Sequence, residues 1–332
     1  MQAIFIFTKD RVHTFKLTFE RVRDFPYPLF VIDDSVDKNN RRVVEETISG
    51  RDETFYCNNE SYQLFLRQKQ VICTSVDLLC GQLGNFDWNL GLARNYALMI
   101  AQSGRFEKVL FMDDDIIVHD RTLPDRAFKL LDHHLVVGAH ITGLTDNSIT
   151  GHIASAFSIS TAVMVSGGFM AFKPDDVQFY FMNIYNEDWI WQFINGFASD
   201  LSWAGEAEHI DADKWSNGVS KACFQEFGEL ALDCASAAFE AQNWMILSES
   251  DFIGIIKATR RTYLLNLTEL ARIDNKPELA RLLDVSEKQL EAISPKALQN
   301  HFNRYFEQNT LLRSYFPDER NSSQVPQKAH AF

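Results

Sequence analysis

The chain has 332 residues, of which 46% are hydrophobic and 23% are charged, and its formal net charge is −13. This balance is typical of a folded globular protein and excludes a disordered one. The negative charge, without a clustered basic segment, argues against nucleic acid as a partner, because phosphate binding needs a basic surface. Its 5 cysteines form no CxxC pair, which favours reduced thiols over disulfides or a zinc site.

The sequence gives no sign of export or of a membrane anchor. The first residues, MQAIFIFTKDR, have no basic leader and too short an apolar run for a signal peptide. Residues 153–172 are uncharged and long enough to span a membrane, but two glycines and several serines favour a buried strand and loop. We therefore expect a cytoplasmic protein without a transmembrane segment, and peripheral contact with a membrane stays open.

The first part of the chain alternates between strand and helix. Residues 3–8 and 29–35 are short apolar runs that end in polar residues, and 12–25 between them has apolar positions at helical spacing. This order predicts a parallel βαβ unit. The stretch that follows is polar, and only 43–48 and 61–68 within it suggest short helices.

The rest of the chain continues this alternation and then becomes helical. A helix at 89–104 leads into a strand at 108–115 that ends in three aspartates. The further elements that the periodicity predicts are a helix at 124–134, a strand at 135–141, helical or mixed segments at 175–184 and 186–197, a helix over much of 221–247, and helices from 259 onward.

The three aspartates that follow the strand predict a cation or ligand site. Adjacent carboxylates repel one another and raise their own pKa values unless a cation offsets their charge. Magnesium and manganese prefer hard oxygen ligands and keep positions open for substrate phosphates. Asp113 and Asp115, a DxD pair, point to the same side of an extended segment. A solvated acidic turn is the alternative, but the carboxyl end of a parallel strand favours a ligand site.

Five segments between residues 29 and 191, taken together, resemble a known enzyme family. LFVIDDS, NLGLARNYAL, VLFMDDDIIV, VSGGFMAFK and NEDWIW occur in the order seen in metal-dependent glycosyltransferases of the GT-A fold, most similar to family-2-type enzymes. The resemblance implies an α/β fold, Rossmann-like, with a mostly parallel sheet flanked by helices. It also implies a Mn²⁺ or Mg²⁺ cofactor and a UDP- or GDP-sugar donor. It does not cover residues 36–70 or the chain after about 230.

This resemblance implies a division of the chain into domains. A GT-A catalytic domain would span 1–258, with a nucleotide-binding half at 1–118 and an acceptor half at 119–258. A helical C-terminal extension at 259–317 would follow, then a disordered tail at 318–332. The extension could form an oligomer, close over the active site or dock a partner.

The resemblance also assigns donor-side roles to residues at the strand ends. Thr8, Asp33 and Asp34 resemble positions that hold the base and ribose, and a carboxylate suits a base N–H or a sugar hydroxyl. Arg94 resembles a basic residue near the base and diphosphate, because its fork fits phosphate geometry. An exposed helix arginine is the alternative.

The same resemblance implies the metal ligands. Asp113 and Asp114 would reach ribose or metal, and Asp115 would be the direct metal ligand. His209, in a segment downstream of the predicted catalytic acid, would be a further ligand, since imidazole suits manganese. A chance position of this histidine is the alternative.

Two further motifs resemble the acceptor side of the family. Gly167 and Gly168 would let the backbone approach a sugar closely, although an ordinary turn between strands explains them equally well. Glu187 and Asp188 resemble the motif that supplies the catalytic base in inverting members, and simple capping of a helix N-terminus is the competitor. Trp189 could stack on a sugar, whereas we expect the neighbouring Trp191 in the core.

The function that follows is metal-dependent transfer of a sugar, hexosyltransferase-like, from a nucleotide-diphosphate donor to a hydroxyl of a glycan or small-molecule acceptor. Asp188 would take the proton of that hydroxyl and the anomeric carbon would be inverted; a retaining outcome stays open. The alternatives are a nucleotidyltransferase acting on sugar phosphates and a non-catalytic protein of the same fold that binds sugar nucleotides or glycans.

Overall fold

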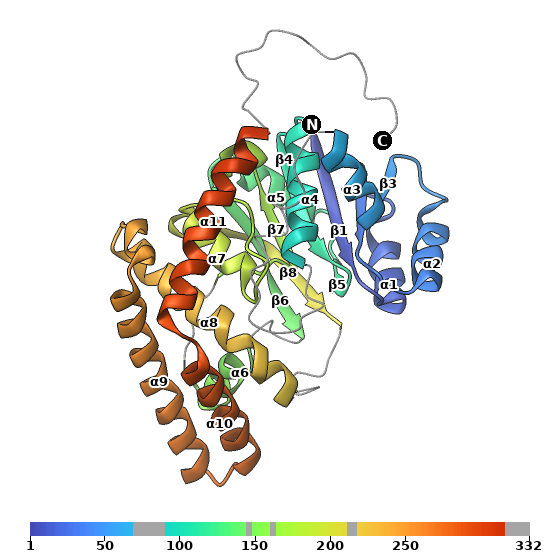
Figure 1. The fold of residues 1–332 in the computed structure, drawn as a ribbon. Helices are drawn as coiled ribbons and strands as arrows, with labels where there is room; N and C mark the ends of the chain where they lie inside the picture. Colours follow the sequence, from blue (N-terminus) through green and yellow to red (C-terminus); the bar gives the residue numbers. More distant parts are fainter. Residues whose placement is uncertain (69–89, 144–147, 160–163, 211–217, 316–332) are drawn as a thin grey trace.

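The computed structural model describes residues 1–68, 90–143, 148–159, 164–210 and 218–315. These residues form a mixed α/β fold in which helices flank a central sheet (Figure 1). The strands of the described chain are β1 (Gln2–Thr8), β2 (Leu29–Asp33), β3 (Thr54–Asn58), β4 (Lys108–Asp113), β5 (Ile116–Ile117), β6 (Val136–Gly143), β7 (Phe169–Phe172) and β8 (Leu201–His209).

The described strands join in the order β3-β2-β1-β4-β7-β6-β8-β5. The pairings of β3 with β2, of β2 with β1 and of β1 with β4 are all parallel, and the sequence predicted the parallel unit of β1 and β2. In the other half β7 is antiparallel to both of its neighbours, β6 and β8 are parallel, and β5 is antiparallel to β8. The α/β class is therefore confirmed, and the sheet is mixed.

Helices cover both faces of this sheet. They are α1 (Val12–Val22), α2 (Lys38–Ile48), α3 (Asn59–Gln68), α4 (Leu90–Ser103), α5 (Leu123–Leu130), α6 (Ile149–Ala156), α7 (Glu187–Ile194), α8 (Gly218–Glu240), α9 (Ser250–Ile273), α10 (Pro277–Ala292) and α11 (Pro295–Tyr315), with short 3₁₀ turns η3 (Pro174–Asp176), η4 (Phe197–Ser199) and η5 (Trp244–Ser248). Along β1, Phe5 packs into the core with α4 and α7, and Ile4 packs into the core with α1, α2 and α5. A strand buried on both faces must be apolar throughout, which explains the sequence AIFIF.

Two of the strands that escaped the sequence analysis, β3 and β8, did so for the same physical reason. β3 lies at the sheet edge and is half-exposed, and β8 carries two glutamates and a glycine, so neither has the apolar run of a buried strand. The uncharged run 153–172 was expected to be strand and loop, but it begins inside α6. Ser148 starts that helix by accepting a hydrogen bond from the amide of Gly151 at 3.0 Å. Of residues 175–184, only the end of η3 has regular structure.

The C-terminal helices extend beyond the sheet, where α9 and α10 lie side by side (Figure 1). α9 begins at Ser250, so the domain boundary expected after residue 258 falls inside a continuous helix. The expected tail, 318–332, lies outside the described residues. Within the described part of the chain, no helix combines the length and apolarity that a membrane crossing requires.

Candidate functional site

The carboxyl ends of β1, β2 and β4 bring the predicted polar residues together. Thr8 pairs with Asp33 in the parallel register of β1 and β2, and Phe7 pairs with Asp113 across β1 and β4. Beyond the strands, the amide of Asp114 donates to the Phe7 carbonyl at 3.0 Å. Parallel strands place their polar ends at one edge of the sheet, and this edge is where ligands bind in open α/β folds.

The donor-side residues predicted from the sequence lie next to one another at this edge. Asp33 is buried, and its carboxylate accepts hydrogen bonds from the Ser35 amide at 2.8 Å and the Tyr56 hydroxyl at 2.7 Å. Asp34 lies 3.3 Å from the Lys9 ammonium group, and its amide donates to the Thr8 carbonyl at 2.9 Å. This edge of the sheet therefore offers two carboxylates and one amine.

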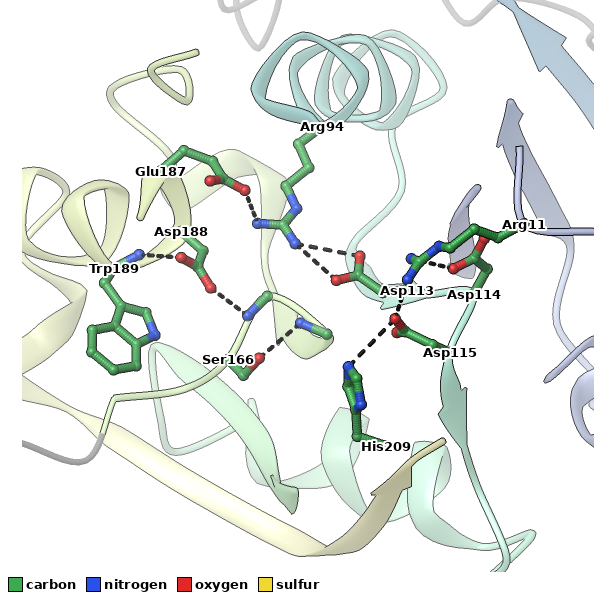
Figure 2. Close-up of polar contacts among 12 residues, drawn as sticks. Arg11, Arg94, Asp113, Asp114, Asp115, Ser166, Glu187, Asp188, Trp189 and His209 are labelled. Atoms are coloured by element: carbon green, nitrogen blue, oxygen red, sulfur yellow. Dashed lines mark hydrogen bonds and ion pairs between the residues drawn. The ribbon is translucent and has the colours of Figure 1, made fainter. Parts of the chain in front are cut away.

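The three consecutive aspartates enter three different environments (Figure 2). Asp113 faces the Arg94 guanidinium at 3.3 Å, whereas burial still raises the pKa of Asp113 above its ordinary value. Asp114 is fully buried and accepts a hydrogen bond from the Thr8 hydroxyl at 2.6 Å, and burial raises its pKa to about 7. Asp115 lies 3.4 Å from the His209 imidazole.

Arg11 was not foreseen from the sequence, although it is central to this cluster. Its guanidinium forms ion pairs with both Asp114 and Asp115 (Figure 2). Burial disfavours the charged form, but the surrounding carboxylates outweigh burial and raise the pKa of Arg11 above its ordinary value. Against burial, His209 and Arg11 together hold the pKa of Asp115 below its ordinary value. A basic residue just past the end of the first strand is the only signal that the sequence offers.

Arg94 joins the aspartates to the second acidic motif. Its side chain is 2% exposed, and the guanidinium lies 2.5 Å from the Glu187 carboxylate and 3.3 Å from that of Asp113 (Figure 2). The exposed-helix alternative is therefore wrong. The guanidinium instead holds together two carboxylates from segments far apart in sequence.

Gly167 makes room for this arginine. A Cβ at Gly167 would lie 2.3 Å from both terminal guanidinium nitrogens of Arg94, which no side chain could accept without movement. A Cβ at Gly168 would meet Ile116 side-chain atoms at 3.2 Å, a tight but softer contact. Close packing against Arg94 therefore explains the first glycine, and the close approach to a sugar, which the sequence analysis gave equal weight with an ordinary turn, stays a prediction.

Glu187 and Asp188 form the first turn of α7 and are both buried. Burial, partly offset by Arg94, raises the pKa of Glu187 to about 8. The Asp188 carboxylate accepts from the Gly167 amide at 2.6 Å and from the Trp189 amide at 2.9 Å. A carboxylate has about four acceptor positions, so these bonds fix Asp188 without exhausting it.

The two tryptophans of this helix lie in different environments. Trp191 is 1% exposed, stacks on Phe181 with ring centroids 4.5 Å apart, and donates its indole N–H to the Phe179 carbonyl at 2.8 Å. Its place in the core is confirmed. Trp189 remains half-buried beside Asp188, so part of its ring can still meet a ligand.

The residues present fit a divalent cation only in part. Asp115 and His209 bring a carboxylate oxygen and an imidazole nitrogen within 3.4 Å, which allows both to bind one ion. Within the described ranges, no three His, Cys, Asp or Glu side chains are grouped so as to hold a metal. Magnesium and manganese usually complete their shell with water and substrate phosphates, and a two-ligand site suits that habit.

No protein-family model matches the chain, and no curated protein sequence matches it. Three of the solved structures to which this chain is similar are a mannosyltransferase, a geranyltransferase and a mannan synthase. A mannosyltransferase from Pyrobaculum calidifontis in complex with GDP-mannose and Mn²⁺ is 11% identical, covering 93% of this chain and 86% of that one, with a TM-score of 0.47. A mannose-1-phosphate geranyltransferase from Thermus thermophilus is 10% identical over 66% and 77% of the two chains, with a TM-score of 0.35. Core-mannan synthase A from Aspergillus fumigatus, in a Mn/GDP form, is 9% identical over 61% and 72%, with a TM-score of 0.28. No function for this chain follows from similarity at this level.

Proposed function

We propose that the chain is a glycosyltransferase of the GT-A type that moves a sugar from a nucleotide-diphosphate donor to an acceptor hydroxyl. One observation carries the proposal: the buried Arg94 joins Asp113, at the donor edge, to Glu187, in the turn that also holds Asp188. The candidate donor site and the candidate proton acceptor thereby belong to one group of contacting residues. Neither motif alone would distinguish an active site from an acidic turn.

On the donor side, Asp33 and Asp34 supply acceptors for a base N–H or ribose hydroxyls of a UDP- or GDP-sugar. Lys9 and Arg11 bring positive charge to the same edge, next to three aspartates. A diphosphate bears several negative charges, so these two cations would offset its repulsion from the carboxylates. Arg11 is thus added to the donor-side residues named from the sequence.

Asp115 and His209 would hold a Mn²⁺ or Mg²⁺ ion, with Asp113 close by but turned to Arg94. When bound, the cation would stabilise the negative charge that develops on the diphosphate leaving group. Arg94 keeps Asp113 and Glu187 in place during the reaction, because its guanidinium is buried and held from two sides.

On the acceptor side, Asp188 would accept the proton of the attacking hydroxyl. The bonds from the Gly167 and Trp189 amides fix the direction of its carboxylate. Attack from the face opposite the leaving group would invert the anomeric carbon. The half-buried Trp189 would stack on the acceptor sugar.

A screen of nucleotide sugars for hydrolysis and transfer tests the proposal. We expect release of nucleoside diphosphate that stops with a chelator and returns with Mn²⁺ or Mg²⁺. Asp115→Ala should act like the chelator, and Asp120→Ala, an exposed carboxylate on the same segment, should not. Pyrophosphate release from a nucleoside triphosphate and a sugar phosphate would instead indicate a nucleotidyltransferase. Binding in a calorimeter without turnover of any donor would indicate a non-catalytic protein.

A further inference from the structure

A second buried arginine, Arg260 of α9, lies among three carboxylates of α8. Its guanidinium contacts Glu226 at 2.7 Å, Glu229 at 3.1 Å and Asp233 at 3.2 Å, and the arginine is 5% exposed. One cation cannot neutralise three anions, and buried charge is unfavourable unless it is paired and hydrogen-bonded. The excess carboxylate oxygens therefore need donors from elsewhere in the molecule.

Two donors from outside α8 and α9 complete this cluster. The Thr150 hydroxyl of α6 donates to Glu226 at 3.2 Å, and the Asn186 side-chain amide donates to Glu229 at 3.1 Å. Glu229 thus forms an ion pair with Arg260 through one oxygen and accepts a hydrogen bond from Asn186 with the other. A continuous line of polar contacts runs from α9 to the residue just before Glu187.

Asn186 is placed in an unusual way for a residue that starts a helix. Its φ of 63° and ψ of 26° lie in the left-handed region, and its side chain makes no capping bond to α7. An asparagine at this position normally uses its side chain to accept from the first helical amides. Here the amide turns outward to Glu229, while the Asn186 carbonyl still accepts from the Ile190 amide at 3.0 Å and so begins the helix.

Close backbone packing supports the same contact. A Cβ at Gly228 would lie 2.2 Å from the Tyr185 carbonyl oxygen, so α8 can approach this turn only because residue 228 is glycine. Gly228 and Glu229 of α8 therefore meet Tyr185 and Asn186, the two residues that precede the acidic turn. Backbone contact fixes the distance, and the Asn186–Glu229 hydrogen bond fixes the orientation.

We propose that α8 and α9 orient the first turn of α7, and with it Asp188, through Asn186, Glu229 and Arg260. The three are positioning residues, since none of them belongs to the candidate donor or acceptor site. The helical extension then acts on the reaction as well as on stability. This inference rests on the proposed function for its kinetic consequence, but its structural consequence stands alone.

The test uses the full chain and begins with Asn186→Gly, which keeps the left-handed backbone and removes the amide. We expect faster hydrogen exchange at the Trp189 and Ile190 amides, a kcat lower by about 10- to 100-fold, and an unchanged KM for the donor. Thr150→Val is the matched control, because it removes the hydrogen bond between α6 and Glu226 of the same cluster. It should leave both the α7 amides and kcat unchanged.

A rescue separates the lost contact from added backbone freedom. Asn186→Asp tolerates the left-handed region but sets two carboxylates against each other, so kcat should fall. Adding Glu229→Gln restores a hydrogen bond with its direction reversed, and kcat should recover. Unchanged α7 exchange in Asn186→Gly, or no recovery in the double variant, would overturn the inference. A chain that turns over no donor but still shows the exchange change would contradict only the proposed function.

Discussion

Arg94 and Arg260 are both buried arginines surrounded by carboxylates, and they differ in where those carboxylates come from. The partners of Arg260 lie on one face of α8, at positions 226, 229 and 233. The partners of Arg94 come from β4 and α7, which are separated by much of the chain. The first cluster joins one helix to another and reaches the candidate site only through Asn186, whereas the second directly sets the relative position of two motifs that carry chemistry. Loss of Arg260 should therefore affect stability more than activity, and loss of Arg94 should affect activity and stability together.

The largest expected effect is a fall in kcat when the site around Arg94 is changed, and no such fall when the Arg260 cluster is changed at Asp233. Asp188→Asn keeps an oxygen that can accept from the Gly167 amide but loses the proton acceptor, so kcat should fall by about 10²- to 10⁴-fold. Nucleotide affinity should hardly change. The matched variant Asp233→Asn, next to Arg260, should keep kcat within about twofold of the parent chain. Equal kcat values for the two variants would remove Asp188 as the base and leave α7 with simple capping.

Replacing each arginine by methionine compares how much each one contributes to the free energy of unfolding. Arg94→Met and Arg260→Met each leave buried carboxylates without their cation, and either should lower the free energy of unfolding by about 3–5 kcal/mol. Denaturant titration measures this loss. Arg94→Met should also abolish turnover under conditions where the protein remains folded, whereas Arg260→Met should lower kcat without abolishing it. Full turnover in a folded Arg94→Met protein would show that Arg94 is not needed to hold the candidate site together.

A smaller effect tests the packing around Arg94. Gly167→Ala forces a Cβ against the guanidinium and should lower stability by about 1–3 kcal/mol, because overpacked cores respond by that amount. Gly254→Ala in α9 is the control, since nothing lies within 4 Å of its Cβ and alanine favours a helix. That variant should unfold at an equal or higher temperature. A neutral Gly167→Ala variant would mean that Arg94 moves easily and is not a rigid link.

The free energy of unfolding should also depend on pH. Burial raises the pKa of Glu187 to about 8 from its ordinary 4.5, so the folded chain keeps a proton that the unfolded chain releases. The stability that this proton provides is complete at low pH and is lost as the pH rises from 4.5 toward 8. The slope for one group is at most about 1.4 kcal/mol per pH unit. Glu187→Gln should flatten the profile measured by urea unfolding at pH 5 to 8, and parallel profiles would contradict the assignment.

The sequence indicated the parts of the site that depend on local pattern. Apolar runs that end in polar residues predicted β1, β2 and β4, and the parallel arrangement placed Thr8, Asp33 and Asp113 at one edge, as observed. The partners of these residues could not be predicted in the same way. The contacts of Arg94 with Glu187, and of Arg11 with Asp114, arise only when distant segments pack, and no spacing along the chain records them.

Strand β8 is a second feature that the sequence pattern could not predict. Its sequence, LSWAGEAEH, gives no periodic apolar face, because the strand is only partly covered. His209 was nevertheless placed near Asp115 by the resemblance alone, and the structure brings the two within 3.4 Å. Whether this pair binds a metal stays a prediction.

Strand β8 has a bulge where it pairs with β6, and this bulge limits how the chain tolerates changes in length. Gly138 stands opposite Trp203, but His140 stands opposite Glu206, so β8 carries one more residue than β6 across this interval. Every side chain beyond the bulge takes its direction from that extra residue. A deletion there would move Ile210 into the place of His209, opposite Ile116 and next to Asp115. A shortened strand would look almost unchanged in an alignment and yet would present the sec-butyl side chain of isoleucine where the imidazole had been. In this strand, the number of residues decides which side chain lies next to Asp115, however similar the sequences are.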